Sequence, residues 1–266
     1  MKTPSDAALG EAASRYGLAL ASIIVRRIEG AGTVPSESTV DPQAPLAAAS
    51  MIKVPIAAAL TRLWLEGSCR PDDQVTIDER NMTPNDAASP LIPGYRARLD
   101  ELGRLMLVRS DNVATNTLID VIGRERATSL AREWGLGATA IRRKLSGSLP
   151  LIADPEATGR NAHPAGDAAA LFDLVARDAI PGSAWLRETL ALQEWNTKLS
   201  AGLTPGDRFA HKTGDTDEVS HDGGILELQS GLRYVIVVFT ALPSSTENDA
   251  RFGEFMTWLR PLLDEN

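Results

Sequence analysis

Three short polar motifs in this sequence contain residue types that could carry out acyl transfer. Ser50 and Lys53 form a Ser-x-x-Lys pattern, and this spacing places both side chains on one face of a helix. An amine so placed can take the hydroxyl proton and make the serine a nucleophile. Chance supplies about one such pair in a chain of 266 residues, so the pair alone does not identify a site.

Two further motifs give that pair more weight. A Ser-Asp-Asn tripeptide occupies residues 110–112, and a Lys-Thr-Gly tripeptide occupies residues 212–214. Each is expected by chance in only about one chain in twenty of this size. Taken singly, the first would be a helix cap and the second a strand residue beside a bend. Their order, about sixty and then about a hundred residues apart, is hard to explain in that way.

With these motifs the sequence resembles the class A β-lactamases and the wider penicillin-recognising serine enzymes. The resemblance covers most of the chain and includes the segments VRSDNVATNTLID, WGLGATAIRRK, NTKLSAGLTPG and FAHKTG. It implies a serine hydrolase that forms an acyl-enzyme, acts on C–N amide bonds, and needs no metal or organic cofactor. The substrate that it implies first is a β-lactam.

The resemblance also implies a role for individual residues. Ser50 would be the acylated nucleophile, and Lys53, crowded by a second cation and partly desolvated, would be neutral enough to act as its base. Ser110 would pass a proton to the leaving nitrogen, and Lys212 would hold that hydroxyl and attract a substrate carboxylate. The predicted substrate-binding residues are Asn112 for an acyl-amide group, Thr213 and Gly214 at the carboxylate pocket, and Asp215, whose backbone amide would bind the oxyanion together with that of Ser50.

The loop that should carry a deacylating glutamate departs from the class A pattern. No Glu-x-x-Leu-Asn sequence occurs, and the expected position falls near residues 146–148, which contain no carboxylate. The acids of the loop over residues 144–166 are Asp154 and Glu156. Glu156 could serve as the base if the loop folds differently; otherwise it is a solvated acid or a partner for Arg160. Without a base, deacylation would slow by about 10²- to 10⁴-fold.

The residue after the third motif is a second departure. Asp215 would repel an anionic substrate unless its side chain turns away while its amide faces the oxyanion. His221 and Asp222 follow at the start of a predicted strand and could bind substrate, although such pairs are more often structural. The two other histidines are interpreted as structural, and three scattered histidines predict no metal site.

Composition excludes several other functions. The net charge is −8 with a pI near 5.0, so nucleic-acid binding is not expected. The single cysteine, Cys69, cannot form an internal disulfide, and no apolar stretch is long enough to cross a membrane. The first residues read as a helix and not as a leader, which predicts a cytoplasmic protein or a mature form with its leader removed. We expect a monomer that acts on a small molecule.

Hydrophobic periodicity predicts an α/β (α+β) fold, in which an antiparallel sheet built from both chain ends and flanked by terminal helices adjoins an all-helical lobe. Residues 1–48 and 200–266 would form the α/β lobe, and residues 49–199 the helical lobe of a single intertwined domain. Residues 68–97 are expected to be an extended loop. The predicted strands are 18–30, 208–214, 223–229 and 232–242, and the predicted inner helices are 50–67, 99–109, 112–123, 126–135, 164–178 and 182–195.

Two other functions remain compatible with these residues. One is an enzyme of the same chemistry acting on another acyl donor, such as a D-amino-acid peptidase, an esterase or an acyltransferase. The other is a non-catalytic penicillin-binding sensor that is acylated once, since acylation requires only Ser50, Lys53 and Ser110. Steady hydrolysis of a β-lactam would indicate the lactamase, and a stable adduct would indicate the sensor.

Overall fold

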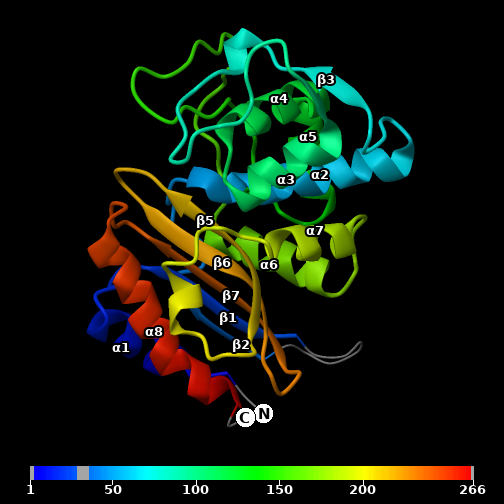
Figure 1. Ribbon diagram of the computed structural model, residues 1–266. Helices are drawn as coiled ribbons and strands as arrows, with labels where there is room; N and C mark the ends of the chain where they lie inside the picture. Colours follow the sequence, from blue (N-terminus) through cyan, green and yellow to red (C-terminus); the bar gives the residue numbers. More distant parts are fainter. Residues whose placement is uncertain (1–2, 29–35, 265–266) are drawn as a thin grey trace.

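The computed structural model describes residues 3–28 and 36–264 (Figure 1). Both chain ends contribute to a five-stranded antiparallel sheet with the order β2-β1-β7-β6-β5, which confirms the predicted fold class. The strands are β1 (Ser22–Arg27), β2 (Glu37–Val40), β5 (Arg208–Asp215), β6 (Ser220–Glu227) and β7 (Arg233–Thr240). The last two residues of the strand predicted over 18–30 lie outside the described residues.

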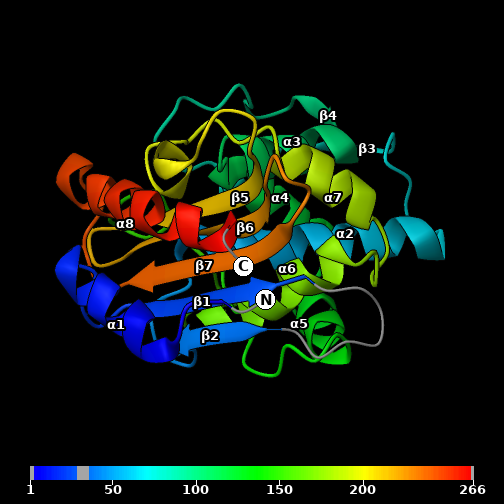
Figure 2. The ribbon, with the colours of Figure 1, turned by 90° about the horizontal axis from the view of Figure 1, so that it is seen from below.

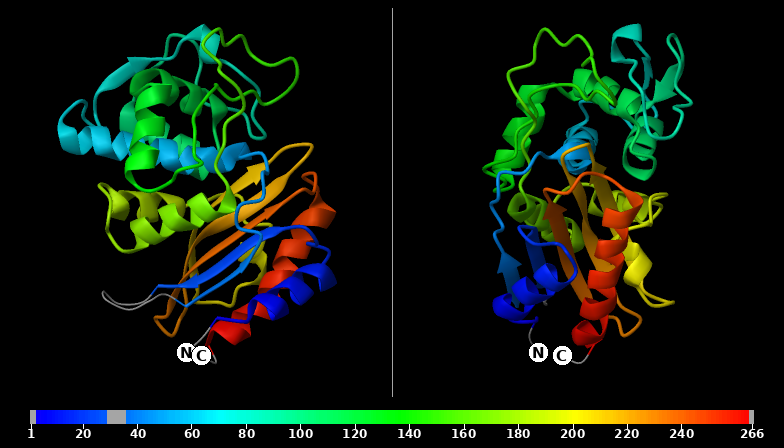
Figure 3. Two further views of the ribbon diagram at one scale, coloured as in Figure 1. Left: turned by 180° about the vertical axis from the view of Figure 1, so that it is seen from behind. Right: turned by 90° about the vertical axis from the view of Figure 1, so that its left-hand side faces the viewer.

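Helices cover both faces of the sheet, which explains why β7 is an almost continuous apolar run. α1 (Asp6–Arg15) and α8 (Thr246–Asp264) pack on one face, as Figures 2 and 3 show. α6 (Ala165–Ala176) packs on the other face, toward the helical part of the chain. Because side chains alternate along a strand, Ile236 and Val238 of β7 pack in the core under α1 and α8. Val235 and Val237 pack in the core on the α6 side.

The remaining helices form the second half of the molecule, above the sheet in Figure 1. α2 (Lys53–Glu66) runs through its centre and is buried over most of its length, so its sequence is apolar on nearly every side. Around it lie α3 (Leu99–Val108), α4 (Asn112–Ile122), α5 (Arg124–Glu133) and α7 (Ser183–Leu190). The predicted helices are thus confirmed, most with shorter bounds and α5 shifted two residues toward the N-terminus, while the lobe boundaries at residues 48 and 200 stay predictions.

The segment predicted as an extended loop over residues 68–97 contains more structure than expected. It forms the short antiparallel pair β3 (Gln74–Thr76) and β4 (Arg96–Arg98) and the 3-10 turn η2 (Glu79–Asn81). Three-residue strands carry too few residues to show an alternating pattern, so they could not be predicted from the sequence. No helix within the described residues is both long and apolar enough to cross a membrane.

Candidate active site

Ser50 lies in a short 3-10 turn, η1 (Ala49–Ile52), directly before α2. The residue that precedes it, Ala49, has φ of 44°, in the left-handed region that residues with a Cβ rarely adopt. Such a backbone costs about 1–3 kcal/mol and persists only where surrounding packing enforces it. The nucleophile predicted from the sequence therefore sits on a strained turn.

Lys53 is fully buried, and its amine contacts polar atoms from both of the first two motifs. The distances from its Nζ are 2.9 Å to Ser50 Oγ, 3.0 Å to Ser110 Oγ, 2.6 Å to Ser110 O and 2.8 Å to Asn112 Oδ1. The carbonyl and amide oxygens can only accept hydrogen bonds, so they take the two N–H groups of a neutral amine. The amine lone pair is then left for the hydroxyls.

The charge state of Lys53 fits that arrangement. Burial is the main cause that lowers its pKa well below the usual value, and the nearby ammonium of Lys212 lowers it further. Asp111 and Asp86 oppose the shift without cancelling it. Only the neutral form of a lysine amine can accept the proton of Ser50, and a lowered pKa makes that form more abundant at neutral pH.

Ser110 reaches this amine from the connection between α3 and α4. Its φ is 59°, again in the left-handed region, so it is the second strained residue of the site. The next residue, Asp111, is the N-cap of α4 and accepts a hydrogen bond from the Ala114 amide at 2.8 Å. The cap fixes where α4 begins, and with it the position of Ser110 beside Lys53.

The third motif lies on β5, the edge strand that borders the helical part. A Cβ on Gly214 would lie 3.2 Å from the Ala49 Cβ and 3.1 Å from the Met51 Cγ, so glycine is what allows β5 to approach the turn that carries Ser50. Lys212 is fully buried, which lowers its pKa to about 7. Its Nζ donates to Thr213 O at 2.8 Å.

One predicted contact is not formed. Among the described residues, the hydrogen bond found for the Lys212 amine goes to its own strand and not to the Ser110 hydroxyl. The Ser110 hydroxyl is instead 3.0 Å from the Lys53 amine. Lys212 instead affects the Lys53 amine through its charge, which lowers the pKa of Lys53.

Asp215 forms an ion pair that the sequence did not reveal. Its Oδ1 accepts from Lys198 Nζ at 2.6 Å, and the same amine also donates to His221 O at 3.2 Å. Lys198 is almost completely buried. The side chain of Asp215 therefore points to the buried ammonium of Lys198. The only sequence signal for this ion pair was Lys198 itself, in the segment that precedes the third motif. Because Asp215 lies 17 residues further along the chain, the pairing could not be predicted from local spacing.

Ser50 and Ser110 open into a cleft of about 540 Å³. Its acidic lining residues are Asp86, Asp215, Asp217 and Asp249, and Lys198 is its basic one. Thr213 lines the same cleft. Four of the predicted residues, Ser50, Ser110, Thr213 and Asp215, thus face one hollow, with the Lys53 amine bonded to the first two.

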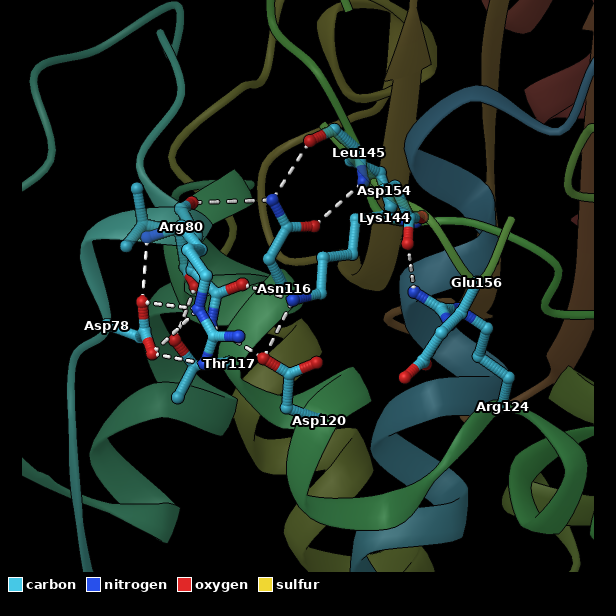
Figure 4. Close-up of polar contacts among 12 residues, drawn as sticks. Asp78, Arg80, Asn116, Thr117, Asp120, Arg124, Lys144, Leu145, Asp154 and Glu156 are labelled. Atoms are coloured by element: carbon cyan, nitrogen blue, oxygen red, sulfur yellow. Dashed lines mark hydrogen bonds and ion pairs between the residues drawn. The ribbon is translucent and has the colours of Figure 1, made fainter. Parts of the chain in front are cut away.

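Glu156 is not brought to this cleft. Its side chain is 81% exposed and binds Arg124 Nη1 at 2.5 Å, while the buried carboxylate of Asp154 binds Arg124 Nη2 at 2.5 Å (Figure 4). It lines a second hollow with Arg124 and Arg142. The alternative prediction, in which Glu156 pairs with Arg160, is also wrong, because the Arg160 guanidinium lies 3.5 Å from the carboxylate of Glu218. Attraction to the α5 arginine holds both loop acids away from Ser50.

A different part of the loop approaches the nucleophile. Asn116 of α4 binds Leu145 through both of its amide atoms, at 2.7 Å to the backbone N and 2.9 Å to the backbone O (Figure 4). Gly147 then lines the cleft and donates its amide to Thr83 Oγ1 at 2.9 Å. The loop segment beside Ser50 therefore carries no carboxylate, as its sequence predicted.

The three histidines are buried and support the fold. Burial lowers the pKa of His221 to about 4 and that of His163 to about 3, so both are neutral. His211 binds Asp222 Oδ1 at 2.7 Å, and the other oxygen of Asp222 accepts from the Leu199 amide at 3.0 Å. Asp222 thereby anchors the segment that carries Lys198. Within residues 3–28 and 36–264, no cluster of His, Cys, Asp and Glu is suited to a metal ion.

The sequence model of the β-lactamase enzyme family matches residues 11–255. The chain belongs to this family. As a member with the Ser50 and Lys53 pair, it is a serine hydrolase of the β-lactamase type, acting on amide bonds. No curated protein matched the chain.

Solved structures share the β-lactamase fold at low sequence identity. A mutant of PBP-A, captured as its acyl-enzyme complex with penicillin G, is 24% identical with a TM-score of 0.85, covering 98% of this chain and 96% of that one. A β-lactamase from Sphaerobacter thermophilus is 20% identical with a TM-score of 0.82, covering 99% of each. A mutant class A β-lactamase of the last common ancestor of Gram-negative bacteria is 22% identical with a TM-score of 0.81, covering 98% of each.

Proposed function

We propose that this β-lactamase family member opens the amide of a β-lactam by forming an ester with Ser50. The Ser50 proton passes to the Lys53 lone pair as its Oγ bonds to the carbonyl carbon. The oxyanion is stabilised by the backbone amides of Ser50 and Asp215. As the C–N bond breaks, the Ser110 hydroxyl gives its proton to the leaving nitrogen and regains one from the Lys53 ammonium. This step leaves Lys53 neutral again.

The observation that carries this proposal is the contact set of the Lys53 amine. It lies 2.9 Å from Ser50 Oγ and 3.0 Å from Ser110 Oγ. The same amine can therefore take the proton of Ser50 and later give a proton to Ser110. Burial lowers the pKa of that amine and so favours the neutral form that a base requires. A neutral base within hydrogen-bond distance of a hydroxyl meets both requirements of general base catalysis.

A second outcome of the same chemistry, a long-lived acyl-enzyme, is favoured by the position of the loop acids. Glu156 and Asp154 are held by Arg124, and Gly147 occupies the wall of the cleft. Deacylation then lacks a positioned loop carboxylate to activate water, a contribution worth about 10²- to 10⁴-fold. The protein would be acylated readily and would lose the acyl group slowly, which is close to the behaviour of a penicillin-binding sensor.

The test combines mass spectrometry with nitrocefin hydrolysis. Ring opening expels no fragment, so the acylated protein should gain the full mass of benzylpenicillin, and peptide mapping should place it on Ser50. Nitrocefin should give a burst of about one product per protein and then slow turnover. Hydrolysis without any burst or adduct would contradict slow deacylation, and no reaction with either compound would contradict the proposed β-lactam substrate.

Glu156→Gln is expected to leave the deacylation rate within about twofold of the starting protein, because the carboxylate faces Arg124. The measurement is the loss of the penicillin adduct over time. Glu218→Gln, another exposed loop acid paired with an arginine, is the matched control. A drop of about 10²-fold in Glu156→Gln alone would show that the loop rearranges and that this residue is the base.

Acylation by a β-lactam that bears a carboxylate should depend on pH through Lys212. Its pKa of about 7 means that raising the pH above neutrality removes the ammonium that attracts the anion. We expect kcat/KM for nitrocefin to fall toward a tenfold loss per pH unit above that point. Lys212→Arg should flatten this limb, since guanidinium stays charged. A profile of unchanged shape in Lys212→Arg would assign the limb to another group.

A further inference from the structure

Ser110 has a left-handed backbone, with φ of 59°, which the surrounding structure must enforce. Because a peptide group is planar, the φ angle of a residue sets the direction of the carbonyl that precedes it, and the ψ angle sets that of its own carbonyl. The two carbonyl oxygens that fix this conformation are therefore those of Arg109 and of Ser110 itself. A hydrogen bond to each of them would hold the strained backbone in place.

Both oxygens accept a hydrogen bond from a distant segment. Ser110 O accepts from Lys53 Nζ at 2.6 Å. Arg109 O accepts from the indole Nε1 of Trp195, 86 residues later, at 3.3 Å, and this is the donor found for that oxygen within the described part of the chain. Trp195 is partly buried and lines the cleft together with Ser50 and Ser110. The peptide that precedes Ser110 is thus bound by a residue of the cleft wall.

The segment that carries this indole is held by a buried glutamine. Gln193 is 6% exposed, and its Oε1 accepts from the Trp195 backbone N at 3.2 Å. Its Nε2 donates to Leu107 O in the last turn of α3, at 3.1 Å, and to His211 O, directly before Lys212 on β5, at 3.4 Å. One side-chain amide therefore ties the tryptophan to the backbone beside the second and the third motif.

We propose that Trp195 is a positioning residue, which holds the left-handed backbone of Ser110 through Arg109 O and so directs the Ser110 hydroxyl at the leaving nitrogen. The proposal rests on the proposed function, in which Ser110 gives its proton to that nitrogen as the C–N bond breaks. Without the indole donor, the peptide between residues 109 and 110 can rotate toward an unstrained conformation. Attack by Ser50 is not affected in this way, because Lys53 Nζ contacts Ser50 Oγ directly, at 2.9 Å.

Trp195→Phe keeps an aromatic ring and removes the indole N–H. We expect the rate of acylation by benzylpenicillin to fall about fivefold, the factor that corresponds to one net hydrogen bond. The measurement is the growth of the acyl-enzyme mass with time. Trp258→Phe is the matched control, since Trp258 is a partly buried tryptophan of α8 outside the cleft lining, and its rate should not change.

A thioester separates proton delivery from the other steps. The S-phenyl thioester of phenylacetylglycine has the same phenylacetylamino group as benzylpenicillin. Ser50 Oγ bonds to its carbonyl carbon as the C–S bond breaks, Lys53 takes the serine proton, and thiophenolate leaves as an anion that needs no proton from Ser110. In Trp195→Phe, the rate of the first thiolate release, followed with a chromogenic disulfide, should stay within about twofold of the starting protein.

A double-mutant cycle tests whether Trp195 acts through Ser110. In a Ser110→Ala background there is no hydroxyl to direct, so adding Trp195→Phe should cause no further loss of penicillin acylation. A tryptophan that merely contacted the substrate, or stabilised the fold, would still cause its fivefold loss in that background. Crystal structures of the starting protein and of Trp195→Phe give a readout without substrate, in which the variant should show a second Ser110 conformation with negative φ.

The outcomes separate this proposal from the proposed function. Equal slowing with penicillin and with the thioester, a loss that persists in the Ser110→Ala background, or an unchanged penicillin rate in Trp195→Phe would each overturn the positioning role. A single left-handed Ser110 in the variant crystal would overturn it as well. Failure of the starting protein to form a penicillin adduct would instead count against the proposed function, and the two crystal structures would still decide whether Trp195 holds Ser110.

Discussion

Replacing Ser50 with alanine is expected to abolish covalent labelling by penicillin, with any remaining acylation at least about 10⁴-fold slower. The reason is that Ser50 Oγ opens into the cleft, contacts the buried amine of Lys53 at 2.9 Å, and belongs to the Ser-x-x-Lys motif that marks the nucleophile. Removing one hydroxyl deletes no apolar contact, so the fold should stay intact. The measurement is intact-mass spectrometry after incubation with benzylpenicillin.

Ser244→Ala provides the matched control for this variant. Ser244 is exposed and lines the same cleft. Labelling should proceed in that variant at the original rate, since no lysine amine among the described residues forms a hydrogen bond with its hydroxyl. An adduct that persists in Ser50→Ala would mean that another hydroxyl, with Ser110 the nearest candidate, is the true acyl acceptor.

Lys53→Met is expected to lower the acylation rate by about 10³-fold, within the range that a positioned general base contributes. Methionine approximates the length of the buried chain but has no lone pair on nitrogen to receive the Ser50 proton. The loss should appear in the rate constant for acylation, measured by stopped-flow with nitrocefin. Raising the pH should partly restore the rate, because solvent hydroxide can then replace the missing base.

Lys53→Arg distinguishes the base from a simple cation. Arginine keeps a positive charge and several donors near Ser110 and Asn112, but it cannot lose its proton in this range. If Lys53 acts as a neutral base, Lys53→Arg should be about as slow as Lys53→Met. Recovery of the original rate in the arginine variant would assign the residue an electrostatic role instead.

The secondary structure and the order of the motifs could be predicted from the sequence because they depend on local patterns. The apolar spacing of α3, α4 and α8 is set by which side faces the core, and the dense Val and Ile of β7 reflect a strand covered on both faces. The strands of only three residues, β3 and β4, were missed because so short a segment has no period.

The polar contacts of the site were harder to predict, because a charged side chain binds whichever partner the fold places nearest. Glu156 has the right chemistry for a deacylation base, yet Arg124, 32 residues earlier, holds it away from Ser50. Asp215 would repel an anion as an isolated acid, yet Lys198 compensates it from a separate segment. The sequence contains both members of each pair but does not state which pairs form.

The sequence by itself determined the family, because three rare motifs in a fixed order are improbable by chance, and it predicted that Ser50, Lys53, Ser110 and Lys212 act together in acyl transfer. Only the tertiary structure decided which contacts these residues make. The lowered pKa of Lys53, the left-handed backbone at Ala49 and Ser110, and the acidic lining of the cleft all arise from burial and from contacts between distant segments. The pKa and the backbone strain depend on the dielectric and on the neighbouring groups that packing creates, and local sequence patterns do not specify these.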